Sequence, residues 1–318
     1  MTTASDAPGR SCPLHYRYAA TGFRRAPDLC ADTLLVAGGL YGNPFALEAL
    51  LEIAAGEPDA VVVFNGDFHW FDTDAAVFRR ISEAALANTA IRGNVETELA
   101  ASGDEAGCGC GYPDWVGDAE VERSNRILLQ LKRTAAVDPE LLGRLGGLPM
   151  HLLAEVGGER VAIVHGDLES LAGWGFSQER LGDDPAGAAR QIASAGVRVA
   201  ASSHTCLPVL AEFESARGTC ALVNNGAAGM PNFAGTRYGI VTRISVRPEG
   251  NALYASHVGG LHVEAHALRF DADAWLACFD SGWPADSAAS VSYRRRIVAG
   301  PAYTPNLVHR RIAASAAF

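Results

Sequence analysis

The chain has 318 residues, of which 48% are hydrophobic and 19% charged, and its formal net charge is −10. This composition is typical of a globular chain that buries a full core without help from disulfides. Nucleic-acid surfaces need clustered positive charge, but Lys132 is the only lysine and the only dense basic runs are the short ones at 294–296 and 310–311. Runs this short are typical of a solvated face, and no nucleic-acid partner is expected. No apolar stretch is long enough to cross a bilayer, and the first thirty residues lack the apolar region of a signal peptide, so the expected location is the cytoplasm, away from membranes.

Strand-like and helix-like runs alternate through the first two-thirds of the chain, which predicts an α/β fold. A first strand is expected over residues 33–37. The next helix should begin at Asn43 and Pro44, because asparagine is a good cap and proline loses no hydrogen bond at the first helical position. That helix should run to Gly56, and the following elements are a strand over 60–64, a helix over 74–87 and a strand over 89–92.

Residues 100–118 break this alternation, because they are rich in glycine and contain Cys108 and Cys110. Such a long irregular loop inside a compact domain is usually functional. The elements expected after it are a helix over 119–136, a hairpin of 151–156 and 160–164, a strand over 197–201, a meander of strands over 209–213, 220–223, 238–245 and 261–268, and a helix over 271–279. We therefore expect an N-terminal extension over residues 1–30 and a single domain over 31–318.

Four predicted strands each run into a side chain that can bind a metal ion. These side chains are Asp67, Asn94, His165 and His204. The carboxyl ends of strands in an open α/β sheet face one crevice, so residues that lie far apart in sequence can converge there. A set of two imidazoles, one carboxylate and one amide oxygen suits zinc, manganese, iron or nickel better than calcium.

The segments that hold these residues resemble the motifs of the calcineurin-like metallophosphoesterases, in particular their compact bacterial branch with a phosphodiesterase-like core. The family motifs are DxHG, GDxxD, GNH followed by an acid, a histidine that ends a later strand, and GHxH. The corresponding segments are GGLYGNPFALEALL at 38–51, NGDFHWFD at 65–72, RGNVETE at 92–98, IVHGD at 163–167 and SSHTCLP at 202–208. The resemblance spans residues 31–280 and implies an αββα sandwich of two mixed β-sheets flanked by helices.

The resemblance also implies a site for two metal ions, bridged by Asp67. One ion would be held in addition by Asn94, His165 and His204, and all four of these ligands are present.

The other half of the site departs from the family pattern. Gly39, Tyr41 and Cys206 stand where the family has an aspartate and two histidines. Val95 replaces the histidine that usually donates a proton or contacts the phosphate. These replacements remove most of the second metal site.

Three outcomes follow from the incomplete site. The protein could bind one ion in the intact half, or it could keep a second ion with Cys206 and His69 as rebuilt ligands. The third outcome is a site that binds a ligand without turnover. His69 is alternatively a general acid or a ring packed among its aromatic neighbours in the sequence.

Other candidate residues lie close to these motifs. A phenol at Tyr41 could act in catalysis by hydrogen-bonding a substrate oxygen, and Arg92 and Asn43 are candidates for substrate contact. Cys108 and Cys110 could bind a soft metal, form a reducible disulfide or be incidental thiols in a loop that reaches over the crevice.

The favoured hypothesis is a hydrolase of phosphate mono- or diesters that uses one or two manganese, iron or zinc ions and a small phosphorylated substrate. One alternative is redox or thiol chemistry at a metal-cysteine site on the same fold. Another is a non-catalytic ligand-binding protein.

Overall fold

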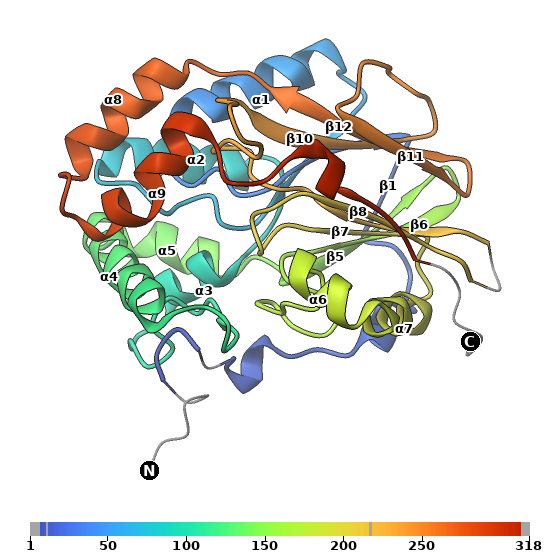
Figure 1. Cartoon of the computed structure of the whole chain (residues 1–318), viewed down its shortest axis with the longest axis horizontal. Helices are drawn as coiled ribbons and strands as arrows, with labels where there is room; N and C mark the ends of the chain where they lie inside the picture. The colour runs from blue at the N-terminus through green and yellow to red at the C-terminus, as the bar shows by residue number, and fades with distance from the viewer. Residues whose placement is uncertain (1–6, 11, 216–217, 313–318) are drawn as a thin grey trace.

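The computed structural model describes residues 7–10, 12–215 and 218–312, and it consists of two stacked β-sheets enclosed by helices (Figure 1). The expected αββα sandwich of two mixed sheets is therefore confirmed. The seven-stranded sheet has the order β1 (Leu29–Ala31), β5 (His151–Val156), β6 (Glu159–Val164), β7 (Val199–Ser202), β9 (Cys220–Asn224), β8 (Val209–Phe213) and β13 (His309–Ile312). The six-stranded sheet has the order β11 (Tyr254–Val258), β12 (Leu261–Leu268), β10 (Gly239–Ser245), β2 (Thr33–Ala37), β3 (Val61–Asn65) and β4 (Thr89–Ile91).

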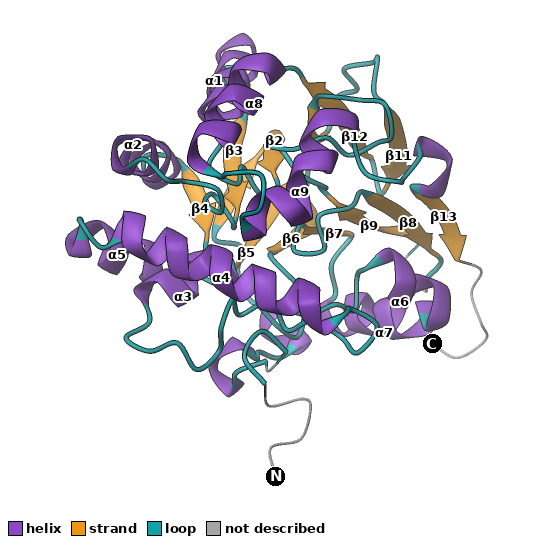
Figure 2. Cartoon of the chain, turned by 60° about the vertical axis from the view of Figure 1, so that its left-hand side comes forward, coloured by secondary structure: helices purple, strands orange, loops and turns teal. Residues whose placement is uncertain are grey.

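Helices cover the outer face of each sheet. The larger group packs in one apolar cluster with β2 and β3 and consists of α1 (Pro44–Gly56), α2 (Ala75–Leu86), α3 (Asn94–Ala100), α4 (Asp118–Ala135), α5 (Pro139–Gly146), α8 (Ala272–Gly282) and α9 (Ala288–Ala299). The smaller group, α6 (Gln178–Asp183) and α7 (Pro185–Ala195), covers the seven-stranded sheet. Helices α4 and α9 contact each other and come forward in Figure 2.

Strand β2 shows why the central strands are apolar at every position. Successive side chains of a strand point to opposite faces. Leu34 and Val36 point into the core between the sheets, whereas Leu35 and Ala37 pack under the helices. Because both faces are buried, the run reads as continuously hydrophobic.

The second half of the chain differs from the expected single meander. Strand β10 does not continue the sheet of β8 and β9 but pairs antiparallel with β2 and β12 in the other sheet. Strand β11, which was not predicted, pairs with β12. Local apolar patterns identify strands but carry no information about which sheet they join, and this explains the error.

The N-terminal segment expected as an extension packs onto the body of the protein. Strand β1 pairs in parallel with β5, and both Tyr16 and Phe23 are fully buried. No helix in the described part of the chain is long and apolar enough to cross a membrane.

Parallel pairing in both sheets places the carboxyl ends of the strands that precede the candidate metal-binding residues at the same edge. Strands β2, β3 and β4 are parallel neighbours in one sheet, and β6 and β7 are parallel neighbours in the other. The loops that follow these strands therefore meet between the two sheets, as expected for α/β architecture.

Candidate metal centre

The loop after β3 is tightly fitted against its neighbours. Gly66 has φ +77°, and a Cβ at this position would lie 2.6 Å from both Gly93 N and His165 Nδ1. Only glycine tolerates both this conformation and this close approach. Asp67 follows with φ 54° and is 6% exposed, so the turn directs a buried carboxylate into the space between the sheets.

A buried carboxylate from α3 ties this loop to the next one. Glu96 accepts hydrogen bonds from the backbone N–H groups of Asp67, Phe68 and Gly93 at 2.8–2.9 Å. Its side chain is fully buried. Glu96 therefore sets the spacing between the two loops that carry Asp67 and Asn94.

Backbone carbonyls determine which nitrogen of each histidine is free to bind a metal. His165 Nδ1 lies 2.9 Å from the carbonyl of Asn65, and His204 Nε2 lies 2.8 Å from the carbonyl of Cys110. A carbonyl only accepts, so both of these nitrogens donate. The lone pairs of His165 Nε2 and His204 Nδ1 are left to face the site, which is the arrangement that metal-binding histidines have.

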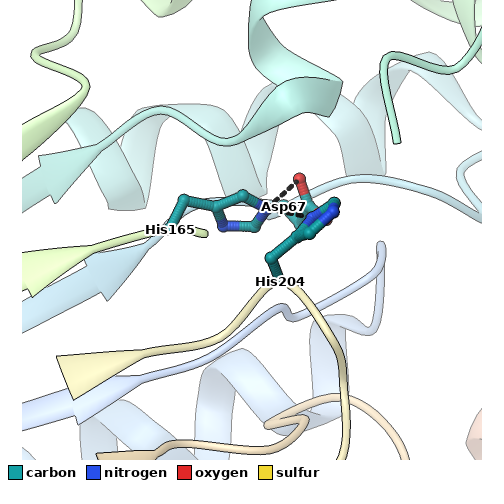
Figure 3. Close-up of side chains that lie close together, drawn as sticks. All are labelled: Asp67, His165 and His204. Carbon is teal, nitrogen blue, oxygen red and sulfur yellow. Dashed lines mark hydrogen bonds and ion pairs between the residues drawn. The ribbon is translucent and has the colours of Figure 1, made fainter. Parts of the chain in front are cut away.

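Potential ligand atoms of Asp67, His165 and His204 converge on this point (Figure 3), and Asn94 Oδ1 lies beside them. His165 Nε2 lies 3.1 Å from Asn94 Oδ1, 3.2 Å from His204 Nδ1 and 3.3 Å from Asp67 Oδ1. Ligand atoms bonded to one transition-metal ion at about 2.0–2.2 Å lie about 3 Å from one another. When both imidazoles are neutral, no proton lies between these atoms, and a bound cation would relieve the repulsion among their lone pairs. The four residues therefore fit a metal ion.

The charges of the site fit the same role. Burial alone would lower the pKa of His165, but the adjacent Asp67 carboxylate outweighs burial and raises it. Burial and the neighbouring His165 lower the pKa of His204 to about 4, which keeps its imidazole neutral near pH 7. Burial opposes the ionised form of Asp67, yet the two histidines lower its pKa. The site holds an ionised carboxylate that attracts positive charge.

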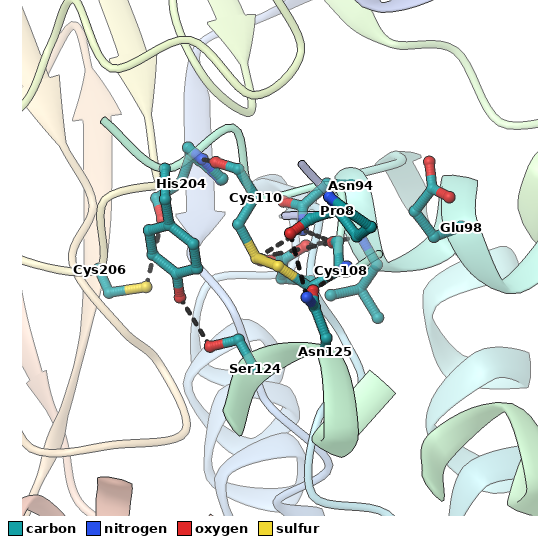
Figure 4. The surroundings of a disulfide bond; sticks show 12 residues. Pro8, Asn94, Glu98, Cys108, Cys110, Ser124, Asn125, His204 and Cys206 are labelled. Carbon is teal, nitrogen blue, oxygen red and sulfur yellow. Dashed lines mark hydrogen bonds between the residues drawn. A yellow bond between two sulfur atoms is a disulfide. The ribbon is translucent and has the colours of Figure 1, made fainter. Parts of the chain in front are cut away.

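The cysteine-rich loop supports two of the four ligands. Cys108 and Cys110 form a disulfide that lies between Asn94 and His204 (Figure 4). Asn94 Nδ2 donates to the carbonyl of Cys108 at 2.9 Å, which turns its Oδ1 toward the other ligands. With the bond from His204 to Cys110, this loop therefore orients one ligand from each sheet.

An aromatic ring lies against Gly39, where the resemblance places the first aspartate of the family motifs. A Cβ on Gly39 would lie only 2.3–2.7 Å from three ring carbons of Tyr41, so the phenol occupies the space that a side chain at position 39 would need. The Tyr41 hydroxyl lies 2.9 Å from Cys206 Sγ. Burial raises the pKa of both groups, so neither supplies an anionic ligand near pH 7.

Within the described residues, the one group of three or more histidine, cysteine and acidic side chains with metal-binding geometry is Asp67, His165 and His204. Neither Cys206 nor His69 belongs to it, and the geometry favours one ion over a rebuilt pair.

Three other candidates lie apart from these ligands. His69 is fully buried, with its nitrogens bonded to Asp72 and Ser82, and it stacks on Phe78 at 4.1 Å, which matches the packed alternative. These contacts leave neither nitrogen free to act as ligand or general acid.

The two candidates for substrate contact also have structural partners. The Asn43 side chain caps α1 through Phe45 N and Ala46 N and donates to Gly229 O. Arg92 donates to the carbonyl of Gly146 at the end of α5. Neither residue lines the cavity beside the metal ligands, so the structure does not bring them to the substrate position.

Sequence reasoning missed several residues of that cavity. The cavity has a volume of about 370 Å³ and is lined by Asp67, Asn94 and His204 at one end. Arg296 of α9 also lines it, and its guanidinium is held by the carbonyls of Pro231 and Cys206. A short run of arginines such as 294–296 predicts a solvated face, and no local signal connects α9 with the site.

Comparisons with known proteins agree with this fold. No family model and no curated protein matches the sequence. The structure is similar to that of a metallophosphoesterase from Sphaerobacter thermophilus, with a TM-score of 0.54 and 18% identity over 85% of this chain and 100% of the other. It is also similar to a hypothetical protein from Pyrococcus horikoshii OT3, with a TM-score of 0.56 and 15% identity over 85% of this chain and 99% of the other. The expected resemblance to metallophosphoesterases is thus confirmed at the level of the fold.

Proposed function

We propose that the protein is a metal-dependent hydrolase of small phosphate esters that uses a single divalent ion, with manganese, iron and zinc as the candidates. The observation that carries the proposal is the convergence of four neutral or anionic ligand atoms from both sheets, each oriented by a backbone group. Their mixed nitrogen and oxygen character suits these metals.

A divalent ion in this position would supply Lewis acidity toward a phosphoryl oxygen and toward a water molecule beside it. Asp67, Asn94, His165 and His204 would hold the ion. The neutral phenol of Tyr41 can donate a hydrogen bond to a phosphoryl oxygen. Arg296 contributes positive charge to the same cavity, where its guanidinium donates to the backbone carbonyls of Pro231 and Cys206.

Val95 determines which ester bonds the site can break. Its side chain is 1% exposed and cannot donate a proton to a leaving group. Its backbone N–H lies 3.3 Å from Asp67 Oδ1 and so helps to position a ligand. The leaving oxygen therefore departs without help from this position, and substrates with stable leaving anions should react fastest.

The contacts of Cys206 favour hydrolysis over the redox alternative. Cys206 Sγ contacts the Tyr41 hydroxyl and the His204 carbonyl and lies outside the metal-binding group. Its raised pKa keeps the thiol protonated, whereas a metal-binding or nucleophilic cysteine requires the thiolate.

Hydrolysis of p-nitrophenyl phosphate, titrated with Mn²⁺ or Zn²⁺, tests the proposal. Loss of an outer-shell partner alone typically costs 10–100-fold, so Asn94→Ala should lower kcat/KM about 100-fold or more. Asn88→Ala is the control, because Asn88 is an exposed residue whose side chain donates to the carbonyl of Ala84. Metal-independent turnover, or an Asn94→Ala variant as active as the control, would overturn the proposal. Metal binding without turnover of any phosphate ester would favour the non-catalytic alternative.

A further inference from the structure

The cavity beside the metal ligands has an aromatic wall that runs outward to solvent. Trp174 packs edge-on against His204, with ring centroids 5.6 Å apart. Trp174 in turn lies 5.7 Å from Tyr112 and 6.4 Å from Trp115 by ring centroids. All three residues line the cavity. The wall therefore connects a metal ligand with the cavity mouth.

Specific contacts hold this wall in place. Trp174 Nε1 donates to the carbonyl of Cys110 at 2.9 Å, which is the same carbonyl that orients His204. The Tyr112 hydroxyl lies 2.9 Å from Ser124 Oγ of α4. A flat ring bound against this wall would meet side chains that are already ordered, so little conformational freedom is lost on binding.

Trp115 is largely exposed, unlike Trp174 and Tyr112. Its side chain is 51% exposed, although a large aromatic surface in water is unfavourable. It stands at the cavity mouth in the irregular segment between α3 and α4. A ligand that covers the Trp115 ring would remove this exposed apolar surface from water.

From these observations, and resting on the proposed function, we infer that the substrate is a phosphate ester of a flat aromatic alcohol. The phosphate would lie between the metal ligands and Arg296, and the ring would lie against Trp174, Tyr112 and Trp115. The cavity volume of about 370 Å³ suits a ligand of this size.

The chemistry at Val95 leads independently to the same substrate class. In the reaction, a water oxygen forms a new bond to phosphorus while the bond between phosphorus and the aryl oxygen breaks. The bonding electron pair leaves on the aryl oxygen, and solvent carries one proton from the attacking water to this aryl oxide. Phenols, with pKa values near 10, are far more acidic than water. An aryl oxide can therefore leave without the proton donor that Val95 has replaced.

Binding of two non-hydrolysable analogues tests the inference without turnover. Phenylphosphonate and cyclohexylphosphonate have similar size, but only phenylphosphonate is flat. We expect calorimetric titration of the Zn²⁺-loaded protein to show at least about fivefold tighter binding of phenylphosphonate, the effect of about 1 kcal/mol from aromatic contacts. The same titrations are run on metal-free protein.

Two variants assign the contributions of ring and phosphate. Trp115→Ala should weaken phenylphosphonate about fivefold and leave cyclohexylphosphonate within twofold, and its exposed position should preserve folding. Arg296→Gln should weaken both analogues about tenfold through the phosphonate. Leu129→Ala, which removes an exposed apolar side chain on α4, is the control.

Equal affinity for the two analogues, or a Trp115→Ala variant with unchanged preference, would overturn the inference. If the protein binds Zn²⁺ and hydrolyses phosphate esters under either result, only the inferred substrate class fails. If the protein binds no metal ion, the proposed function fails, while a preference for phenylphosphonate in metal-free protein that depends on Trp115 would still support the aromatic site.

Discussion

The close packing of Tyr41 against Gly39 predicts that substitutions at these two positions are energetically coupled. A Cβ on Gly39 would lie 2.3 Å from Tyr41 Cζ, whereas non-bonded carbons prefer about 3.5–4.0 Å. The ring is buried, with Tyr41 only 3% exposed, so it cannot move away freely. Gly39→Ala should therefore lower the free energy of unfolding by about 2 kcal/mol through overpacking.

Removing the ring should relieve this penalty. Tyr41→Ala alone should cost about 3 kcal/mol, because it leaves a cavity in the core. The double variant should cost little more than Tyr41→Ala, which gives a coupling energy of about 2 kcal/mol. Urea unfolding of the metal-free native protein, the two single variants and the double variant, followed by circular dichroism, measures the four free energies of unfolding.

Gly22→Ala serves as the control, since no atom lies within 4 Å of a Cβ at that position. Its effect should add to that of Tyr41→Ala. If Gly39→Ala and Tyr41→Ala were additive within about 0.5 kcal/mol, the ring would not occupy the proposed place.

Three further predictions concern the groups that support the metal ligands. Glu96→Gln places an amide N–H₂ where the carboxylate accepts backbone N–H groups, so unfolding measured at pH 8 should show a loss of about 2–3 kcal/mol, and an unchanged stability would contradict this role. A Cys108→Ser/Cys110→Ser variant removes the disulfide of the loop whose carbonyls orient Asn94 and His204. Calorimetry should show about tenfold weaker Zn²⁺ binding, and unchanged affinity would refute this role of the loop. The lowered pKa of His204 means that the unfolded chain takes up this proton first, so the free energy of unfolding of metal-free protein should fall as pH drops from about 6.5 to about 4. If NMR showed that His204 of the folded protein titrates near pH 6.5, this prediction would be contradicted.

The parts of the fold that local sequence determines were predicted well. Strand β2 and helix α1 have the expected bounds, because a continuous apolar run and an Asn-Pro cap are signals contained within a few residues. The convergence of Asp67, Asn94, His165 and His204 was also predicted, since parallel strands bring their carboxyl ends together. In the structure the four side chains lie beside one another, and their role as metal ligands stays a prediction.

Features that depend on tertiary packing were not predicted. Arg296 and Trp174 reach the cavity from elements far away in sequence, and nothing in their neighbourhoods indicates this. His69 stands two residues after Asp67, yet the chain turns after Asp67 and its ring packs against α2. Glu96 had a local signal that was not used, namely an acidic residue in the first turn of a short helix that begins at Asn94.

The central claim is that one metal ion binds at the ligands contributed by both sheets. Calorimetric titration with Zn²⁺, checked by elemental analysis of the loaded protein, measures this directly. We predict one ion per chain for the native sequence, loss of binding in His204→Ala, and unchanged binding in His257→Ala, which alters an exposed histidine of β11. Two ions per chain, or a His204→Ala variant that binds Zn²⁺ as tightly as the native protein, would contradict the claim.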